Sequence, residues 1–132
     1  VTPVASAEEL YKTCQFVSLH IPATAETKQS INYSLLSLMP KGALLINTAR
    51  KEVIYEEDLA RILEERTDFH YVADVAPTIA DTLKEKFGNR VFFTPKKMGA
   101  QTAEANINAG IAAARQSVGY LKDGIDKFRV NK

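Results

Sequence analysis

The 132-residue chain contains no tryptophan and a single cysteine, and none of its apolar runs is long enough to cross a bilayer. A lone cysteine cannot form an internal disulfide, so we expect a reducing, cytoplasmic compartment and no disulfide scaffold. The formal net charge is only +1, which gives no electrostatic argument for binding nucleic acid or a membrane surface. The basic C-terminal third also lacks the aromatic platform on which bases stack. These deficits favour a globular enzyme or interaction module of single-domain size.

Short apolar runs recur along the first hundred residues, and each has the length of a buried strand. The runs are Phe16–Leu19, Ala43–Ile46, Tyr71–Val75 and Val91–Phe93. Between them, Ser34–Met39 and Tyr55–Arg66 have helical periodicity, and acidic residues gather at the start of the second segment. Strands that alternate with helices of this length predict right-handed βαβ units and a parallel sheet.

The segment Ala100–Lys122 is different in kind, because it reads as one long helix. Ile107, Ile111 and Val118 belong to an apolar stripe that repeats every three or four residues. We interpret the stripe as a core-facing surface, either across a sheet or against another domain. Gly124 follows at the position where a helix commonly ends.

Polar side chains follow each of the apolar runs, at the point where each strand should end. They are Ser18 and His20, Asn47 to Arg50, Asp74, and the segment Thr94 to Thr102. Because the carboxyl ends of parallel strands meet at one edge of a sheet, we expect these groups to line a common cleft. Arginine there offers a fixed charge and a planar fork of donors suited to a carboxylate.

Each of these groups also has an ordinary structural interpretation. A surface arginine after a core strand is commoner than a substrate ligand, and a single histidine is more often a structural hydrogen-bonding residue. Asp74 would serve as a loop or helix cap, and Lys96 and Lys97 as a solvated pair. Four such groups in this order at one edge are harder to assign to chance.

The order of these residues resembles the NAD-dependent D-2-hydroxyacid dehydrogenases, and among them the 3-phosphoglycerate dehydrogenases. That family has a strand ending in H-x-P, a G-A-x-x-I-N-x-A-R run, an L-D-V-like strand, and T-P-H-x-G before a long helix. The corresponding segments here are His20–Pro22, Gly42–Arg50, Ala73–Val75 and Thr94–Gly99, and Phe128–Asn131 resembles the segment that follows the long helix. The resemblance covers nearly the whole chain.

The resemblance implies a role for individual residues. Arg50 would hold the carboxylate and carbonyl of a small 2-hydroxy acid, and Asp74 would hydrogen-bond the nicotinamide carboxamide of NAD. The remaining cofactor contacts that it implies are His20, Pro22, Thr48, Ala49, Gly99 and Ala100. No metal is expected.

Two positions depart from the family pattern. The position of the family's catalytic histidine is Lys97, and the glutamate that supports that histidine is replaced within Pro77–Ala80. A histidine needs a partner to set its tautomer, whereas a lysine has none to set, so the two changes read as one coupled replacement. Like charge from Lys96 and Arg50 would favour the neutral, proton-accepting amine. We therefore predict Lys97 as the acid/base, as in a lysine-bearing subgroup that looks similar; a dead site is the alternative.

The implied fold is α/β: half of a doubly wound, Rossmann-like parallel sheet of about four strands with crossover helices. Residues 1–99 would be the second half of the NAD-binding domain, and residues 100–132 the long helix and tail that return toward a substrate domain. The phosphate-binding G-x-G-x-x-G turn does not occur in the sequence. We therefore expect this fragment alone to bind NAD weakly or not at all and to be inactive.

The parent protein is expected to oxidise 3-phospho-D-glycerate to 3-phosphohydroxypyruvate with NAD, the first step of serine biosynthesis, as a cytoplasmic homodimer. A dehydrogenase for another D-2-hydroxy acid is one alternative. A non-catalytic half-domain used for interaction is another, although the pairing of Arg50 with Lys97 argues against it. The strand Phe16–His20 would be an apolar edge, so we expect a partner, a swapped segment or neighbouring molecules to cover it.

Overall fold

The computed structural model describes residues 2–95 and 102–130. The chain divides into two compact units, Val1–Lys97 and Met98–Lys132, and each is described by itself. The domain boundary that the sequence predicts at residue 99 falls outside the described residues, so it stays a prediction.

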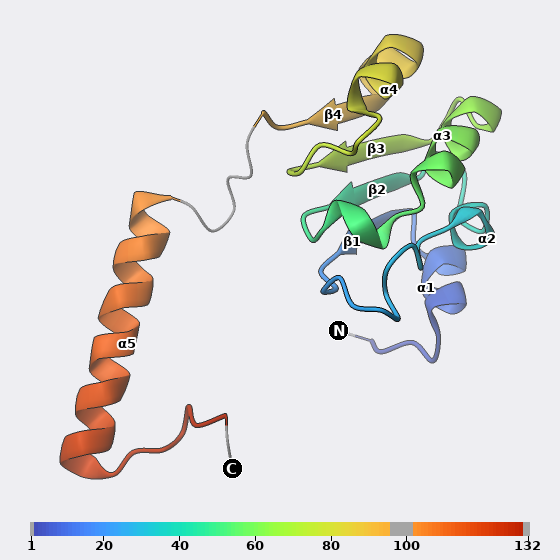
Figure 1. Ribbon diagram of the computed structural model, residues 1–132. Helices are drawn as coiled ribbons and strands as arrows, with labels where there is room; N and C mark the ends of the chain where they lie inside the picture. Colours follow the sequence, from blue (N-terminus) through green and yellow to red (C-terminus); the bar gives the residue numbers. More distant parts are fainter. Residues whose placement is uncertain (1, 96–101, 131–132) are drawn as a thin grey trace. The chain divides into compact units, whose positions relative to one another are not determined.

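The first unit alternates helices and strands (Figure 1). Its elements are α1 (Ala7–Thr13), β1 (Phe16–Leu19), α2 (Tyr33–Leu36), β2 (Leu44–Asn47), η1 (Lys51–Val53), α3 (Glu56–Glu65), β3 (His70–Ala73), α4 (Ala80–Phe87), η2 (Gly88–Arg90) and β4 (Val91–Phe93). The strands form one parallel sheet in the order β1-β2-β3-β4. The α/β class, the parallel sheet and its four strands are therefore confirmed.

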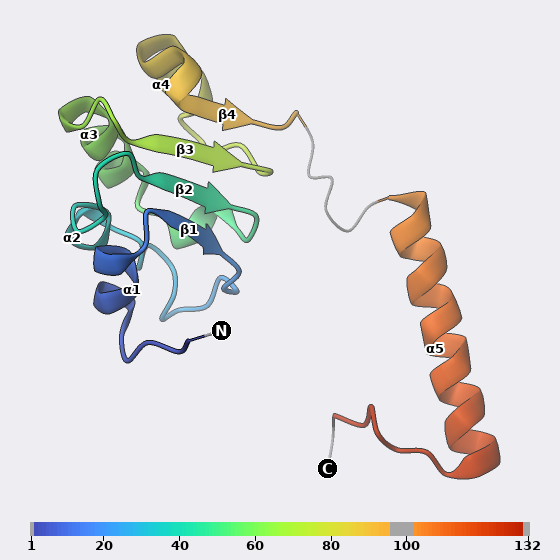
Figure 2. The same ribbon diagram turned by 180° about the vertical axis from the view of Figure 1, so that it is seen from behind.

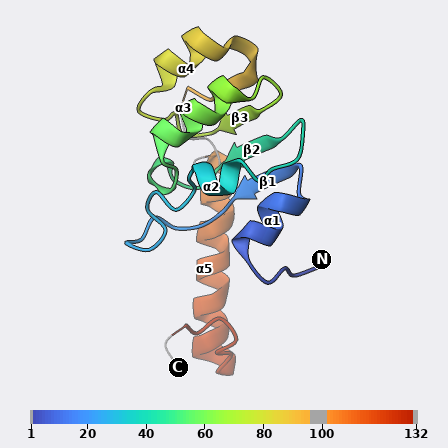
Figure 3. The ribbon, with the colours of Figure 1, turned by 90° about the vertical axis from the view of Figure 1, so that its right-hand side faces the viewer.

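The helices of this unit gather toward one end of the strands. Figures 1 and 2 both show α1–α4 on the side of the arrow tails, and Figure 3, seen from that side, shows them in front of the strands. The loops that follow the strands form the opposite end. This arrangement leaves the carboxyl end of the sheet to the loops, which is where open α/β sheets bind their ligands.

The core lies between the helices and one face of the sheet. The largest fully buried side chains are Leu36, Leu45, Asn47, Val53, Leu59, Ile62, Leu63, Phe69, Tyr71 and Leu83. Side chains alternate between the two faces of each strand, and this decides which strand residues are buried. In β1, Val17 and Leu19 are buried, whereas Phe16 is 64% exposed. Along β2 the same alternation leaves Leu44 and Ile46 half-buried, while Leu45 and Asn47 are buried.

Local chemistry accounts for where several elements start and turn. Asn32 accepts a hydrogen bond from the Leu35 amide and so caps α2. Gly42, just before β2, has φ of +74°, and a Cβ there would lie 2.8 Å from Gln15 Nε2. The left-handed backbone favours glycine at that turn, whereas the flexible Gln15 side chain could move away from a Cβ.

The helices α1 and α4 were not expected from the sequence. Each is short and contributes few buried side chains: Tyr11 from α1, and Leu83 and Phe87 from α4. So few apolar positions do not establish a helical period in a sequence. Packing of these side chains against the unit's core therefore stabilises both helices.

The second unit contains α5 (Ala103–Asp123), which confirms the predicted long helix. Thr102 caps its start through its side chain, and Gly124 ends it with φ of +64°. Within its own unit the apolar stripe is open: Ile107 is 61% exposed and Leu121 is 81% exposed.

The strand β1 is an edge strand of the described sheet. What covers it in the assembled protein stays a prediction.

Candidate functional site

The loop after β2 carries the arginine that the sequence singled out. The Asn47 side chain holds this loop: its Nδ2 donates to the Arg50 carbonyl (3.0 Å), and its Oδ1 accepts from the Ala49 amide (3.0 Å). The backbone of Thr48 to Arg50 is thus a tight turn built over a buried carboxamide.

The Arg50 side chain itself is exposed, and within residues 2–95 it has no hydrogen bond or ion pair. It lines a hollow of about 360 Å³ together with Thr24, Lys28 and Glu52. Two cationic side chains therefore border this hollow against one carboxylate. The arrangement suits an anionic group that the chain does not itself supply.

His20 and Thr48, which come from adjacent strand ends, meet at this end of the sheet. His20 Nδ1 lies 3.4 Å from Thr48 Oγ1, and its Nε2 lies 2.9 Å from Ser18 Oγ. The His20 ring is exposed, so both contacts hold it at the surface of the strand end. Pro22 is also exposed, and its carbonyl accepts from the Thr27 hydroxyl in the loop that follows.

Asp74 directly follows β3, and its amide donates to the carbonyl of Asn47 (3.2 Å). Its own carbonyl accepts from Thr94 Oγ1 (2.9 Å), which ties the ends of β3 and β4 together. The carboxylate oxygen Oδ1 is buried and has no hydrogen-bond partner among the described residues. A buried oxygen of this kind is costly unless a donor reaches it, so it can accept an N–H from outside the described residues.

The turn Pro77–Ala80, at the position of the family's glutamate, is held by hydrogen bonds from other parts of the chain. The Glu56 carboxylate accepts from the amides of Thr78 (2.7 Å) and Ile79 (3.3 Å). Lys51 Nζ lies 3.4 Å from Thr78 Oγ1. Asp81, the nearest carboxylate in sequence, is in the first turn of α4 and exposed, where it favours the helix dipole.

Three of the predicted site residues, Lys97, Gly99 and Ala100, lie outside the described residues. Their roles stay predictions. The other six, His20, Pro22, Thr48, Ala49, Arg50 and Asp74, lie in segments that directly follow β1, β2 and β3. The parallel register of these strands brings the segments to one end of the sheet.

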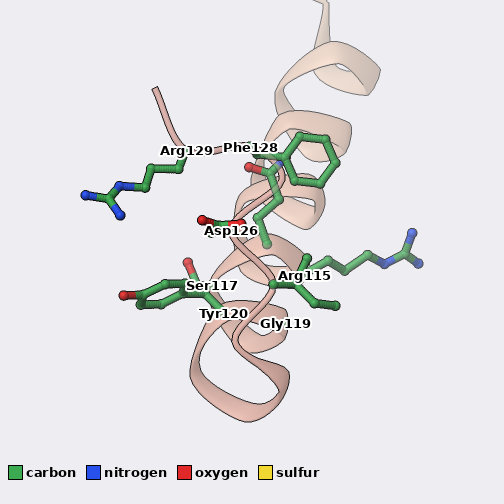
Figure 4. Close-up of a pocket in the computed structure, with 9 residues that line it drawn as sticks. Arg115, Ser117, Gly119, Tyr120, Asp126, Phe128 and Arg129 are labelled. Atoms are coloured by element: carbon green, nitrogen blue, oxygen red, sulfur yellow. The ribbon is translucent and has the colours of Figure 1, made fainter. Parts of the chain in front are cut away.

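A larger hollow, of about 610 Å³, lies in the C-terminal unit, between the end of α5 and the tail (Figure 4). It contains none of the predicted site residues. Figure 4 shows the side chains of Arg115 and Arg129 extending away from each other, so the hollow does not gather their charges. Its walls are exposed side chains, including Phe128 at 60% exposure.

The described ranges contain no cluster of three or more His, Cys, Asp or Glu residues arranged to hold a metal ion. Across those same ranges, no helix combines the length and the apolar character needed to cross a membrane.

The sequence placed Asn47 at this end of the sheet without assigning it a role, and the contribution of Tyr71 was not predicted. Asn47 is 1% exposed, and its Nδ2 is 3.4 Å from the Tyr71 hydroxyl. Burial raises the pKa of Tyr71 to about 12, so the hydroxyl stays protonated. The strand period carried the signal, because Asn47 lies two positions after the buried Leu45 and shares its face.

Residues 1–96 match the family described as D-isomer specific 2-hydroxyacid dehydrogenase, NAD binding domain. The chain is 34% identical over 134 positions to D-3-phosphoglycerate dehydrogenase of Haemophilus influenzae, covering 97% of this chain and 32% of that protein. It is 36% identical over 131 positions to the chloroplastic D-3-phosphoglycerate dehydrogenase 2 of Arabidopsis thaliana, covering 97% and 21%.

Among solved structures, the chain is similar to the NAD+-bound 3-phosphoglycerate dehydrogenase of Entamoeba histolytica. The TM-score is 0.81 at 49% identity, and the match covers 100% of this chain and 44% of that one. The chain thus spans less than half the length of each of these relatives.

The parallel sheet, with polar groups gathered at its carboxyl end, defines a Rossmann-like nucleotide-binding half-domain. More specifically, the chain belongs to the NAD-binding domain family of the D-isomer-specific 2-hydroxyacid dehydrogenases.

Proposed function

We propose that this chain is the second half of the cofactor-binding domain of a D-3-phosphoglycerate dehydrogenase. The parent enzyme oxidises the 2-hydroxyl of 3-phospho-D-glycerate to a ketone and passes the hydride to NAD. The names of the Haemophilus, Arabidopsis and Entamoeba relatives support this choice of substrate.

The observation that carries the proposal is the state of Arg50. Its guanidinium is exposed beside a hollow and has no partner within residues 2–95, while its backbone is fixed by Asn47. A held backbone with an open guanidinium suits a residue that binds an external carboxylate through paired N–H donors. In the reaction, the same donors stabilise the charge that develops on the substrate oxygen.

The residues at the end of β3 fit the nicotinamide. The buried Asp74 Oδ1 is an acceptor that lacks a donor, and a carboxamide N–H supplies one. When bound, NAD accepts the hydride that leaves C2 of the substrate. Thr48 and His20, which meet 3.4 Å apart, border the same end of the sheet and contact the cofactor.

Lys97 is the acid/base of the proposal. Its neutral amine takes the proton from the substrate hydroxyl while the C2 hydrogen leaves with its electron pair as hydride, so the C–O bond becomes a carbonyl. The carboxylate that would partner a histidine is not needed, and Glu56 of α3 instead holds the Thr78–Ile79 turn.

Turnover of 3-phosphoglycerate by the full-length protein, followed through NAD reduction, tests the proposal. Lys97→Met should lower kcat by several orders of magnitude, because general acid–base catalysis contributes about 10²–10⁴-fold. The matched control is Lys96→Met, which removes the neighbouring charge and should cost much less. A loss of less than tenfold in Lys97→Met would contradict the assigned role.

A further inference from the structure

Asn47 is a polar side chain placed where apolar ones belong. It ends β2 on the core face, two positions after Leu45, and only 1% of it is exposed. A buried carboxamide is tolerated only when its donor and acceptor groups are paired. Its partners therefore show why the position is polar.

Both ends of the carboxamide are used on the same loop. Oδ1 accepts from the Ala49 amide and Nδ2 donates to the Arg50 carbonyl, each at 3.0 Å. The pairing allows one orientation of the carboxamide, because an amide N–H requires an acceptor and a carbonyl requires a donor. The side chain thus connects the Thr48–Ala49 peptide group with the Arg50–Lys51 peptide group, and the backbone between them, including the Arg50 Cα, is held on both sides.

The Tyr71 hydroxyl is a third contact. It comes from the neighbouring strand β3 and lies 3.4 Å from Asn47 Nδ2. Tyr71 is itself 1% exposed, and its ring meets the Phe93 ring edge-on at 5.7 Å between centroids. The carboxamide is therefore supported from a rigid part of the core.

We propose that Asn47 is a positioning residue for Arg50, which it holds at the angle needed to bind the substrate carboxylate. This inference rests on the proposed function, since Arg50 is the group through which Asn47 acts. A side chain on a loop gains precision from such buried support, because small displacements of a binding group weaken its contacts.

Aspartate at position 47 separates the two hydrogen bonds. A carboxylate still accepts from the Ala49 amide, but it cannot donate to the Arg50 carbonyl and it repels that oxygen. When protonated, the same group regains a donor. The Asn47→Asp variant therefore weakens the support of Arg50 in a way that acid reverses.

The experiment uses the full-length enzyme and compares Asn47→Asp with wild type under steady-state conditions. We expect KM for the hydroxy acid to rise about tenfold, with a smaller change in kcat and in KM for NAD, because Arg50 binds the carboxylate in both ground and transition states. The ratio of variant to wild-type KM should shrink as pH falls. A general loss of structure would lower the active fraction and leave KM unchanged.

Gln15→Glu is the matched control. Gln15 Nε2 also donates to backbone carbonyls, those of Lys41 (3.0 Å) and Gly42 (3.2 Å), but before the start of β1 rather than after β2. This variant makes the same carboxamide-to-carboxylate change at the other end of the sheet. Its KM values should match those of wild type.

If Asn47→Asp does not fold, Asn47→Ser provides the same KM test, because the short serine hydroxyl cannot bridge both peptide groups. A folded Asp or Ser variant with KM within twofold of wild type overturns the inference, and so does an effect confined to KM for NAD. Arg50→Lys in the same assay distinguishes a failure of the proposed function from a failure of this inference. If Arg50→Lys is harmless, the proposed function fails; if it is damaging and the position-47 variants are not, only this inference fails.

Discussion

The two ends of the sheet use their polar side chains differently. At the amino end, arginine, aspartate and glutamine side chains are hydrogen-bonded to nearby backbone or to one another. At the carboxyl end, Arg50 has no partner within residues 2–95, and Asp74 Oδ1 is buried without one. The comparison separates charges that are paired within the fold from charges that have no partner among the described residues, which we propose bind a ligand.

The amino end is closed by two arginines. Arg66 donates to the carbonyls of Met39 (2.7 Å) and Pro40 (2.8 Å) and pairs with Asp68 at 2.6 Å. Arg90 donates to the carbonyls of Leu63 and Arg66, at 2.7 and 2.8 Å. These side chains satisfy carbonyls in the turns and helix ends before the strands, so their charges are consumed within the fold.

At the carboxyl end, hydrogen bonds hold the backbone of the residues whose side chains have no partner. Asn47 is hydrogen-bonded to the loop that presents Arg50, and Thr94 to the backbone of Asp74. Backbone is held while the functional atoms stay open. Such unpaired polar atoms are typical of ligand sites.

The largest expected effect is on Arg50. In the full-length enzyme, Arg50→Met should lower kcat/KM at least a hundredfold, because removing one partner of a charged, desolvated pair costs about 2–5 kcal/mol. The free energy of unfolding should stay within about 0.5 kcal/mol of wild type, since the side chain is exposed. Kinetics with 3-phosphoglycerate and urea unfolding of the same preparations measure both. A stability loss equal to that of an Arg66 variant would break the comparison.

The opposite outcome is expected for Arg66. Arg66→Met leaves the Met39 and Pro40 carbonyls without their donor and removes the cationic partner of the Asp68 carboxylate, so the free energy of unfolding should fall by about 2–4 kcal/mol. KM for substrate should not change. Arg61→Met is the control, because Arg61 is exposed, its ion pair is with Glu65 of the same helix, and its guanidinium stacks on the Tyr33 ring without donating to backbone carbonyls among the described residues. Equal losses in the two variants would show that the amino-end hydrogen bonds contribute little.

A smaller effect concerns the pH dependence of stability. Hydrogen bonds from Arg66 and from the Gly42 amide hold the pKa of Asp68 well below its usual value. A lowered folded-state pKa adds stability above the unfolded value of about 3.9, and that stability is lost as pH falls through the folded pKa. Asp68→Asn should therefore cost about 1–2 kcal/mol at neutral pH and progressively less below about pH 4. Urea unfolding across this range measures the difference; a constant difference at all pH values would contradict the assignment.

Much of the fold could be predicted from local patterns. The strands β1 and β4 have the predicted bounds, β2 is shifted by one residue, and α3 lies within the predicted segment. Their apolar runs and acidic helix start are signals that act at short range. The short helices α1 and α4 could not be predicted, because two or fewer buried side chains in each leave no period to read.

The candidate site was predictable in part for the same reason. A parallel sheet places the segments after its strands at one end, so His20, Thr48, Arg50 and Asp74 could be grouped from their order alone. Their roles in binding stay predictions. Asn47 was grouped with them but its supporting role was not predicted, because asparagine after a strand usually signals a turn and not a buried support.

The sequence by itself determined the alternation of strands and helices, and with it the parallel sheet and the end at which its polar groups gather. These follow from short-range periodicity and from the connectivity of βαβ units. Only the tertiary structure decided which charges are used up and which remain open. That distinction depends on partners distant in sequence, such as Asp68 for the Gly42 amide and Tyr71 for Asn47.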